Sequence, residues 1–117
     1  MSSIDQPLIV ANWKMQLSIA DSVRLASRIA HKIVPSAQAE VVLCPSYIAI
    51  TSVRSELNAI KSSNHHNIEV GAQNVSQYEA GAYTGEVSAE QLKGMCEFAI
   101  VGHSERRLHF GETRAVE

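Results

Sequence analysis

The sequence has little of what marks a secreted, membrane-bound or nucleic-acid-binding protein. Cysteine occurs only at Cys44 and Cys96, each beside apolar residues, so we expect two small buried side chains, no disulfide and a cytoplasmic protein. No apolar run approaches the roughly 18 residues of a membrane span, and the first ten residues do not resemble a signal peptide. Ten Lys and Arg against twelve Asp and Glu leave no broad positive charge for nucleic acid. An anionic small molecule would therefore need a local positive site.

What the sequence does contain predicts a single α/β domain. Its 117 residues are 45% hydrophobic and 19% charged, as in one ordinary globular unit. Short apolar runs rich in β-branched or aromatic residues are typical of buried strands. Four such runs are present, at Pro7–Trp13, Val41–Cys44, Ile68–Ala72 and Phe98–Val101.

Helical patterns separate the predicted strands. Residues 17–34 and 47–60 carry apolar side chains at three- and four-residue steps, which places them on one face of each helix. A third helix over Ser88–Met95 would begin with a capping box formed by Ser88 and Gln91. Alternation of strand and helix favours parallel strands with right-handed crossovers. The inward positions are Val23, Ala26, Ala30, Ile33 and Val34 in the first helix, and Ala49, Val53, Leu57 and Ile60 in the second.

Polar residues follow each predicted strand. In parallel α/β folds the loops after the carboxyl ends of the strands converge on one face, where reactive groups gather. The segments concerned are Asn12-Trp13-Lys14, Cys44-Pro45-Ser46, Gln73-Asn74 and His103-Ser104-Glu105. We therefore predict that these polar side chains lie around one rim of the sheet.

The ammonium of Lys14 suits an anionic substrate and negative charge that develops during a reaction. A single lysine after a strand is, however, more often simply solvated. Asn12 is compatible with a hydrogen bond to a substrate or with one that satisfies loop backbone.

His103 precedes the sequence SERR, which would begin a helix with Ser104 near the cap and Glu105 in the first turn. The partial positive charge of a helix N-terminus disfavours an added proton and keeps an adjacent imidazole neutral. A neutral imidazole can donate its N–H to a carbonyl or an enediolate-like oxygen. The alternative is a structural histidine bonded to nearby backbone.

The remaining charged residues are less specific. Glu105 suits pairing with Lys14 or assistance in proton movement, while Arg106 and Arg107 suit the bracing of carboxylates across loops. The segment Ser62–Asn67, with two histidines, is predicted to be an exposed loop. It lacks the ligand spacing of a metal site.

Three segments together resemble the triosephosphate isomerase family: ANWKM at Ala11–Met15, AQNVSQYEAGAYTGEVSAEQLK at Ala72–Lys93, and VGHSERR followed by FGET. The resemblance runs from about Pro7 onward. It implies a (β/α)8 barrel, usually dimeric, that interconverts dihydroxyacetone phosphate and glyceraldehyde 3-phosphate in glycolysis and gluconeogenesis without a cofactor or a metal.

The resemblance also implies roles for individual residues. Asn12 and Lys14 would bind the substrate, and Lys14 would also stabilise negative charge. His103 would polarise the carbonyl and move protons between the two substrate oxygens, and Glu105 would be the catalytic-site carboxylate beside Lys14. The segment from Gln73 to Val87 resembles a long loop that enters a neighbouring subunit. Its expected contact residues are Gln73, Asn74, Tyr83, Thr84, Gly85 and Glu86.

The sequence departs from the family in its length. A (β/α)8 barrel takes about 250 residues, so residues 1–117 are expected to form the N-terminal half of such a domain, from the first strand to the start of the fourth helix. The family's glutamate base, lid and phosphate loops have no counterpart here. Since isomerisation needs a carboxylate to take the carbon-bound proton, we expect the chain alone to be inactive.

A half-barrel would also leave unpaired strand edges and an exposed apolar face. Three arrangements would cover them: a complementing C-terminal half, a homo-oligomer of this chain, or a longer parent of which this is a fragment. The last is favoured because the sequence ends soon after the fourth helix begins. Another functional interpretation is a non-enzymatic, oligomeric half-barrel that serves as a binding or scaffold module. A different sugar-phosphate barrel has little support from these motifs, and it predicts that Lys14 and His103 do not converge on one ligand.

Overall fold

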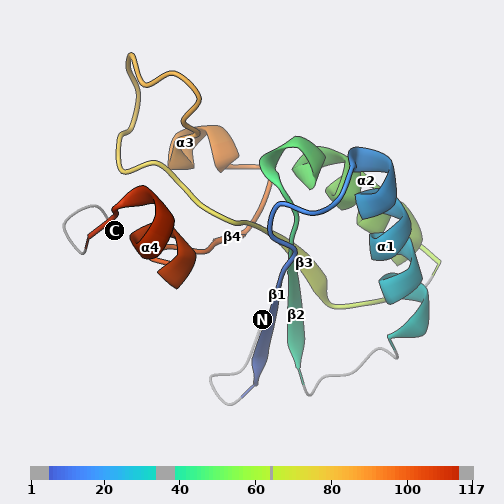
Figure 1. Ribbon diagram of the computed structural model, residues 1–117. Coiled ribbons are helices and arrows are strands. Elements are labelled where there is room, and N and C mark those ends of the chain that lie inside the picture. Colours follow the sequence, from blue (N-terminus) through green and yellow to red (C-terminus); the bar gives the residue numbers. More distant parts are fainter. Residues whose placement is uncertain (1–5, 34–38, 64, 114–117) are drawn as a thin grey trace.

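Four parallel strands form one curled sheet in the computed structural model, which describes residues 6–33, 39–63 and 65–113 (Figure 1). Each strand pairs with the one that precedes it in the chain, in the order β1-β2-β3-β4. Helices lie between the strands, so the architecture is that of half a (β/α)8 barrel, as predicted. The strands are β1 (Leu8–Asn12), β2 (Glu40–Cys44), β3 (Ile68–Ala72) and β4 (Phe98–Ala99).

Helices α1 (Ile19–Lys32) and α2 (Ile50–Lys61) lie on the same side of the sheet (Figure 1). Helix α1 begins where Ser18 accepts a hydrogen bond from the amide of Asp21, 3.1 Å away. Its predicted inward residues Ala26 and Ala30 are fully buried. Val34, predicted to lie on the same face, falls outside the described residues.

The apolar stripe of α2 forms the centre of the core. A short 3-10 turn, η1 (Tyr47–Ala49), leads into this helix. Complete burial of a leucine, isoleucine or valine side chain stabilises a fold by about 1.5 to 3 kcal/mol, so this stripe anchors the helix firmly. All four predicted inward positions, Ala49, Val53, Leu57 and Ile60, are buried and pack with Leu43, Ile68 and Val70 of the sheet.

The two outer strands differ from the buried ones. In β1 the side chains of Leu8, Ile9 and Val10 remain about half exposed. Strand β4 is shorter than the predicted Phe98–Val101, and Gly102, with a φ of 64°, lies between it and helix α4 (Ser104–Phe110). The apolar surface expected at the edges of a half-barrel is therefore present at β1.

The prediction that Ser62–Asn67 is an exposed loop was wrong at His66, whose side chain is buried. Its Nε2 lies 2.9 Å from the carbonyl oxygen of Leu57, and its Nδ1 accepts a hydrogen bond from the amide of Ile68. The ring is buried because it satisfies backbone groups of both α2 and β3 at their junction. Asn64 is outside the described residues.

Helix α3 (Ala89–Leu92) is shorter than the predicted Ser88–Met95. Its start is as predicted: Ser88 accepts a hydrogen bond from the amide of Gln91, whose side chain accepts one from the amide of Ser88. Gly94, with a φ of 84°, lies directly after the C-cap and ends the helix early.

Both cysteines are free thiols, as predicted. Cys44 is fully buried and Cys96 partly so. Burial raises the pKa of the Cys44 thiol to about 11, which leaves it protonated and unreactive at neutral pH. In the part of the chain that the structure describes, no helix combines the length and apolar character needed to cross a membrane.

Candidate functional site

Side chains from all four strand ends line a single open pocket of about 520 Å³. This volume is within the range of small-molecule sites. The predicted convergence of polar residues at one rim is therefore confirmed. The pocket is lined by Asn12, Lys14, Met15, Ser46, Tyr47, Gln73, Asn74, Gly85, Glu86, His103, Glu105, Arg106 and Phe110.

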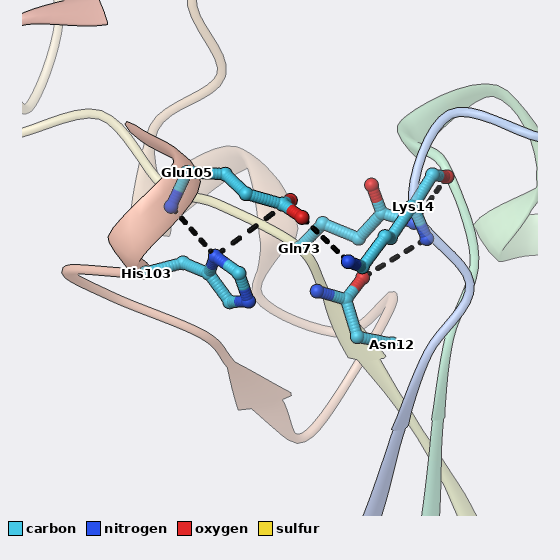
Figure 2. A network of polar contacts seen from close by, with 5 residues as sticks. All are labelled: Asn12, Lys14, Gln73, His103 and Glu105. Atoms are coloured by element: carbon cyan, nitrogen blue, oxygen red, sulfur yellow. Dashed lines mark hydrogen bonds and ion pairs between the residues drawn. The ribbon is translucent and has the colours of Figure 1, made fainter. Parts of the chain in front are cut away.

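Lys14 and Glu105 form an ion pair across the pocket, although they are 91 residues apart in the sequence. The Lys14 Nζ lies 2.5 Å from the Glu105 Oε1, and each side chain is about half exposed (Figure 2). The hydrogen bond from Lys14, followed by its positive charge, lowers the pKa of the Glu105 carboxyl from its ordinary value of 4.5. Of the two roles predicted for Glu105, the structure shows the pairing.

His103 is itself the N-cap of α4, directly before the predicted Ser104. Its Nδ1 accepts a hydrogen bond from the backbone amide of Glu105 at 3.1 Å. A ring nitrogen that accepts an amide hydrogen bond has no proton of its own, so the ring proton belongs on Nε2. The Glu105 Oε2 lies 3.7 Å from the same Nδ1, farther away than the amide. This geometry favours a neutral imidazole that can donate from Nε2.

Asn12 uses its side-chain oxygen within the chain. Its Oδ1 accepts a hydrogen bond from the backbone amide of Lys14 at 3.0 Å (Figure 2). Of the two predicted uses of Asn12, the structure therefore shows the satisfaction of loop backbone, and contact with a substrate stays a prediction.

The long segment after β3 projects away from the sheet (Figure 1). It is closed at its base by a hydrogen bond from the Ser76 amide to the Val87 carbonyl at 2.8 Å. Near its tip the rings of Tyr78 and Tyr83 stack with centroids 3.8 Å apart. The segment thus has an internal structure of its own.

The residues predicted to contact a second subunit have different surroundings. Tyr83 and Thr84 are exposed, and Gly85 and Glu86 reach the rim of the pocket. Asn74 accepts a hydrogen bond from the Tyr47 hydroxyl through its backbone carbonyl. The side-chain amide of Gln73 is bonded to backbone within the chain. Contact of these six residues with another subunit stays a prediction.

Ser46 follows β2 and lies at the rim, as the strand-end rule predicts. Sequence reasoning missed Met15, Tyr47 and Phe110, which also line the pocket. Arg106 and Phe110 lie three and seven positions after His103, a spacing that places all three on one helix face. The Arg106 guanidinium lies 4.7 Å from the centre of the Phe110 ring, and its Nε is 2.7 Å from the Glu112 Oε2. Glu112 lies just after the end of the same helix, so the bracing of carboxylates across loops that was predicted for Arg106 stays a prediction.

The arrangement combines a cation with a neutral N–H donor in one open pocket. The Lys14 ammonium can attract an anionic ligand, and the His103 Nε2 can donate to a carbonyl oxygen of the same ligand. Glu105 connects the two: its carboxylate binds the Lys14 ammonium, and its backbone amide donates to the His103 Nδ1 (Figure 2). Among residues 6–33, 39–63 and 65–113, no group of three or more His, Cys, Asp or Glu is placed to hold a metal ion.

Comparison with known proteins gives one consistent result. A family model described as triosephosphate isomerase matches residues 7–116. Proteins named triosephosphate isomerase from Shewanella sediminis (strain HAW-EB3) and Shewanella amazonensis (strain ATCC BAA-1098 / SB2B) are 45% and 46% identical to this chain over 113 residues. The matched part is 95% of this chain but 43% of each relative, so the chain spans less than half the length of these relatives.

Proposed function

The chain belongs to the triosephosphate isomerase family, and we propose that it provides the Lys14 and His103 part of an isomerase site. The reaction would interconvert dihydroxyacetone phosphate and glyceraldehyde 3-phosphate. The observation that carries this proposal is the meeting of Lys14, Glu105 and His103 in one pocket of about 520 Å³.

In the proposed reaction a carboxylate removes a proton from the carbon next to the substrate carbonyl. The C–H electron pair forms the C=C bond of an enediolate, and the carbonyl π electrons move to oxygen. The His103 Nε2–H donates to that oxygen and moves a proton between the two oxygens, while the Lys14 ammonium stabilises the negative charge. Asn12 and Lys14 would hold the phosphorylated triose. No cofactor is needed, because the substrate is neither oxidised nor reduced overall.

We propose that the base is supplied from outside this chain. Glu105, the carboxylate nearest His103, is engaged by the Lys14 ammonium, which lowers its pKa and makes it a weaker base. On this view residues 1–117 form the N-terminal half of a barrel domain and are inactive alone. The assembled enzyme would work in glycolysis and gluconeogenesis in the cytoplasm.

The proposed partner is a complementing C-terminal half or a second copy of the chain. Exposed apolar side chains support association: Leu8, Ile9 and Val10 of β1 are about half exposed, and Leu108 and Phe110 of α4 are exposed by 78% and 68%. The exposed tip formed by Tyr83 and Thr84 would add a subunit contact. The same surfaces would also suit a non-enzymatic oligomeric module, which is the second candidate.

An assay on chain purified free of host isomerase separates these candidates. The chain is tested with glyceraldehyde 3-phosphate alone and after mixing with the part of the Shewanella sediminis relative that it does not match. We expect turnover only in the mixture, and its loss when the chain carries His103→Gln. Native mass spectrometry establishes that the complex forms. A complex with no turnover would contradict the isomerase proposal and favour the non-enzymatic module.

A further inference from the structure

The backbone of Lys14 has an unusual conformation. Its φ is 58°, and among the described residues it is the one position other than glycine with a positive φ. For a residue with a side chain this conformation is strained, because the Cβ lies too close to the following carbonyl oxygen. Such strain persists only where surrounding groups hold the backbone in place.

Three side chains bond to the peptide groups of Lys14. The Asn12 Oδ1 accepts from its amide, and the Gln73 Nε2 donates to its carbonyl oxygen at 2.8 Å (Figure 2). The Ser46 Oγ donates to the same carbonyl oxygen at 3.2 Å. Ser46 follows β2 and Gln73 follows β3, so the Lys14 carbonyl is bonded from the ends of the next two strands of the sheet. The shorter of these two bonds comes from Gln73.

The Gln73 amide is itself fixed. Its Nε2 also donates to the carbonyl oxygen of Cys44, at 2.9 Å. Cys44 is the fully buried last residue of β2, and its carbonyl also accepts from the Trp13 amide. An amide NH₂ group has two hydrogens to donate, and these two bonds use both. Gln73 thus ties the backbone of Lys14 to the buried end of β2.

We propose that Gln73 is a positioning residue for Lys14, which it holds in the left-handed backbone conformation that directs the ammonium toward Glu105 and the pocket. Its significance for catalysis rests on the function proposed above, whereas the positioning itself does not. Gln73 was predicted from the resemblance as a subunit contact, and this inference assigns it a separate task inside the chain. A purely structural amide would satisfy the same two carbonyls without affecting the ammonium.

The test is the substitution Gln73→Met, which keeps the length of the side chain and removes both donors. NMR titration of the Glu105 side-chain carboxyl reports where the Lys14 ammonium lies, because that ammonium lowers the pKa of this group. We expect the Glu105 pKa to rise in Gln73→Met toward the value found in Lys14→Met. This rise is expected although Gln73 bonds the backbone carbonyl of Lys14 and not its ammonium. The one-bond Cα–Hα coupling of Lys14 should also lose its positive-φ value.

Two further variants keep the test decisive. Gln91→Met removes a glutamine that accepts a backbone hydrogen bond in the capping box of α3; it should lower stability and leave the Glu105 titration unchanged. Ser46→Ala removes the longer bond to the same Lys14 carbonyl and should raise the Glu105 pKa by less than Gln73→Met. If Gln73→Met does not fold, Ser46→Ala decides the question.

An unchanged Glu105 titration in folded Gln73→Met, or in Ser46→Ala when that variant decides, would overturn the inference. An equal rise of the Glu105 pKa in Gln91→Met would overturn it too, because the Glu105 pKa would then report a general loss of stability and not the position of the Lys14 ammonium. The titration involves no substrate. Failure here therefore leaves the isomerase proposal standing, and failure of the turnover assay leaves this inference standing.

Discussion

Helices α2 and α4 both follow a strand of the same sheet, yet their packing differs completely. In α2 the residues Ile50, Val53, Leu57 and Ile60 are all buried against α1 and the sheet. Helix α4 has no buried residue among the described part of the chain, and its Leu108 is 78% exposed. The first helix is held by apolar packing. The contacts of the second are mainly polar, above all the pair between Lys14 and Glu105.

The difference matters because the candidate site draws on both regions. Gln73 follows the buried strand β3 and Lys14 follows the outer strand β1, whereas His103 and Glu105 lie at the start of the weakly packed helix. Regions with few buried apolar contacts open at low free energy. The site therefore depends on a few polar contacts to keep its two sides together, and a partner that covers α4 would stabilise it.

The largest expected effect comes from truncating equivalent leucines in the two helices. Leu57→Ala in α2 should lower the free energy of unfolding by about 3 kcal/mol, because it leaves a cavity in the core. Leu108→Ala in α4 should change it by less than about 0.5 kcal/mol, because that side chain is already in solvent. Urea unfolding followed by circular dichroism measures both. Similar losses for the two variants would contradict the difference in packing.

A second pair of substitutions tests the sheet against the end of α4. A methyl group added at Gly71 in β3 would lie 2.9 Å from the Cys44 Sγ and 3.0 Å from the Val42 Cγ1. We expect Gly71→Ala to cost roughly 1 to 3 kcal/mol through overpacking. Gly111, the C-cap of α4, has open space around it but a φ of 68°.

The expected cost of Gly111→Ala is about 1 kcal/mol, from backbone strain alone. It should appear as faster amide hydrogen exchange confined to α4, whereas Gly71→Ala should speed exchange throughout the sheet. If Gly111→Ala also speeded amide exchange in β2 and β3, helix α4 and the sheet would be more tightly coupled than their packing indicates.

The smallest effects concern two carboxylates with opposite pKa shifts. The Lys14 contact lowers the pKa of Glu105, so this group stabilises the fold above its ordinary pKa of 4.5 and loses that contribution as the pH falls through the lowered value. Burial, followed by the charge of Glu97, raises the pKa of Glu69, so its ionised form destabilises the fold at neutral pH.

At pH 7 we therefore expect Glu105→Gln to lower the urea midpoint and Glu69→Gln to raise it. Both differences in urea midpoint should shrink in acid. The effect of Glu105→Gln should disappear below the lowered pKa of Glu105, and the effect of Glu69→Gln should disappear below 4.5, the ordinary pKa of Glu69. The effect at Glu105 should also weaken in 1 M salt, because the pair is exposed and screened. Urea midpoints that shift in the same direction for both variants at pH 7 would contradict the stated causes of the two pKa shifts.

The sequence predicts the packed region well, because local pattern and final packing agree there. Val53 and Leu57 lie on the predicted face of α2 and pack against other buried residues of the chain, and Ser88 caps α3 where the pattern places it. The exposed loop was predicted wrongly at His66, since its two backbone partners belong to elements that meet only in three dimensions.

The site shows the same limit. The strand-end rule indicates Lys14, Ser46, Gln73 and His103, and the structure brings all of them to one pocket. What the sequence could not predict is the conformation between them. The positive φ of Lys14 and the two bonds from Gln73 depend on the spacing of strands that are far apart in the chain.

The central claim is that Lys14 and His103 serve one ligand. The most direct test adds dihydroxyacetone phosphate to the labelled chain and follows the Lys14 ammonium and the His103 imidazole by NMR. Our account predicts that both signals move along one saturation curve and that Lys14→Met abolishes the response of His103. A Lys14 signal that shifts equally with inorganic phosphate, while His103 stays unchanged, would contradict it.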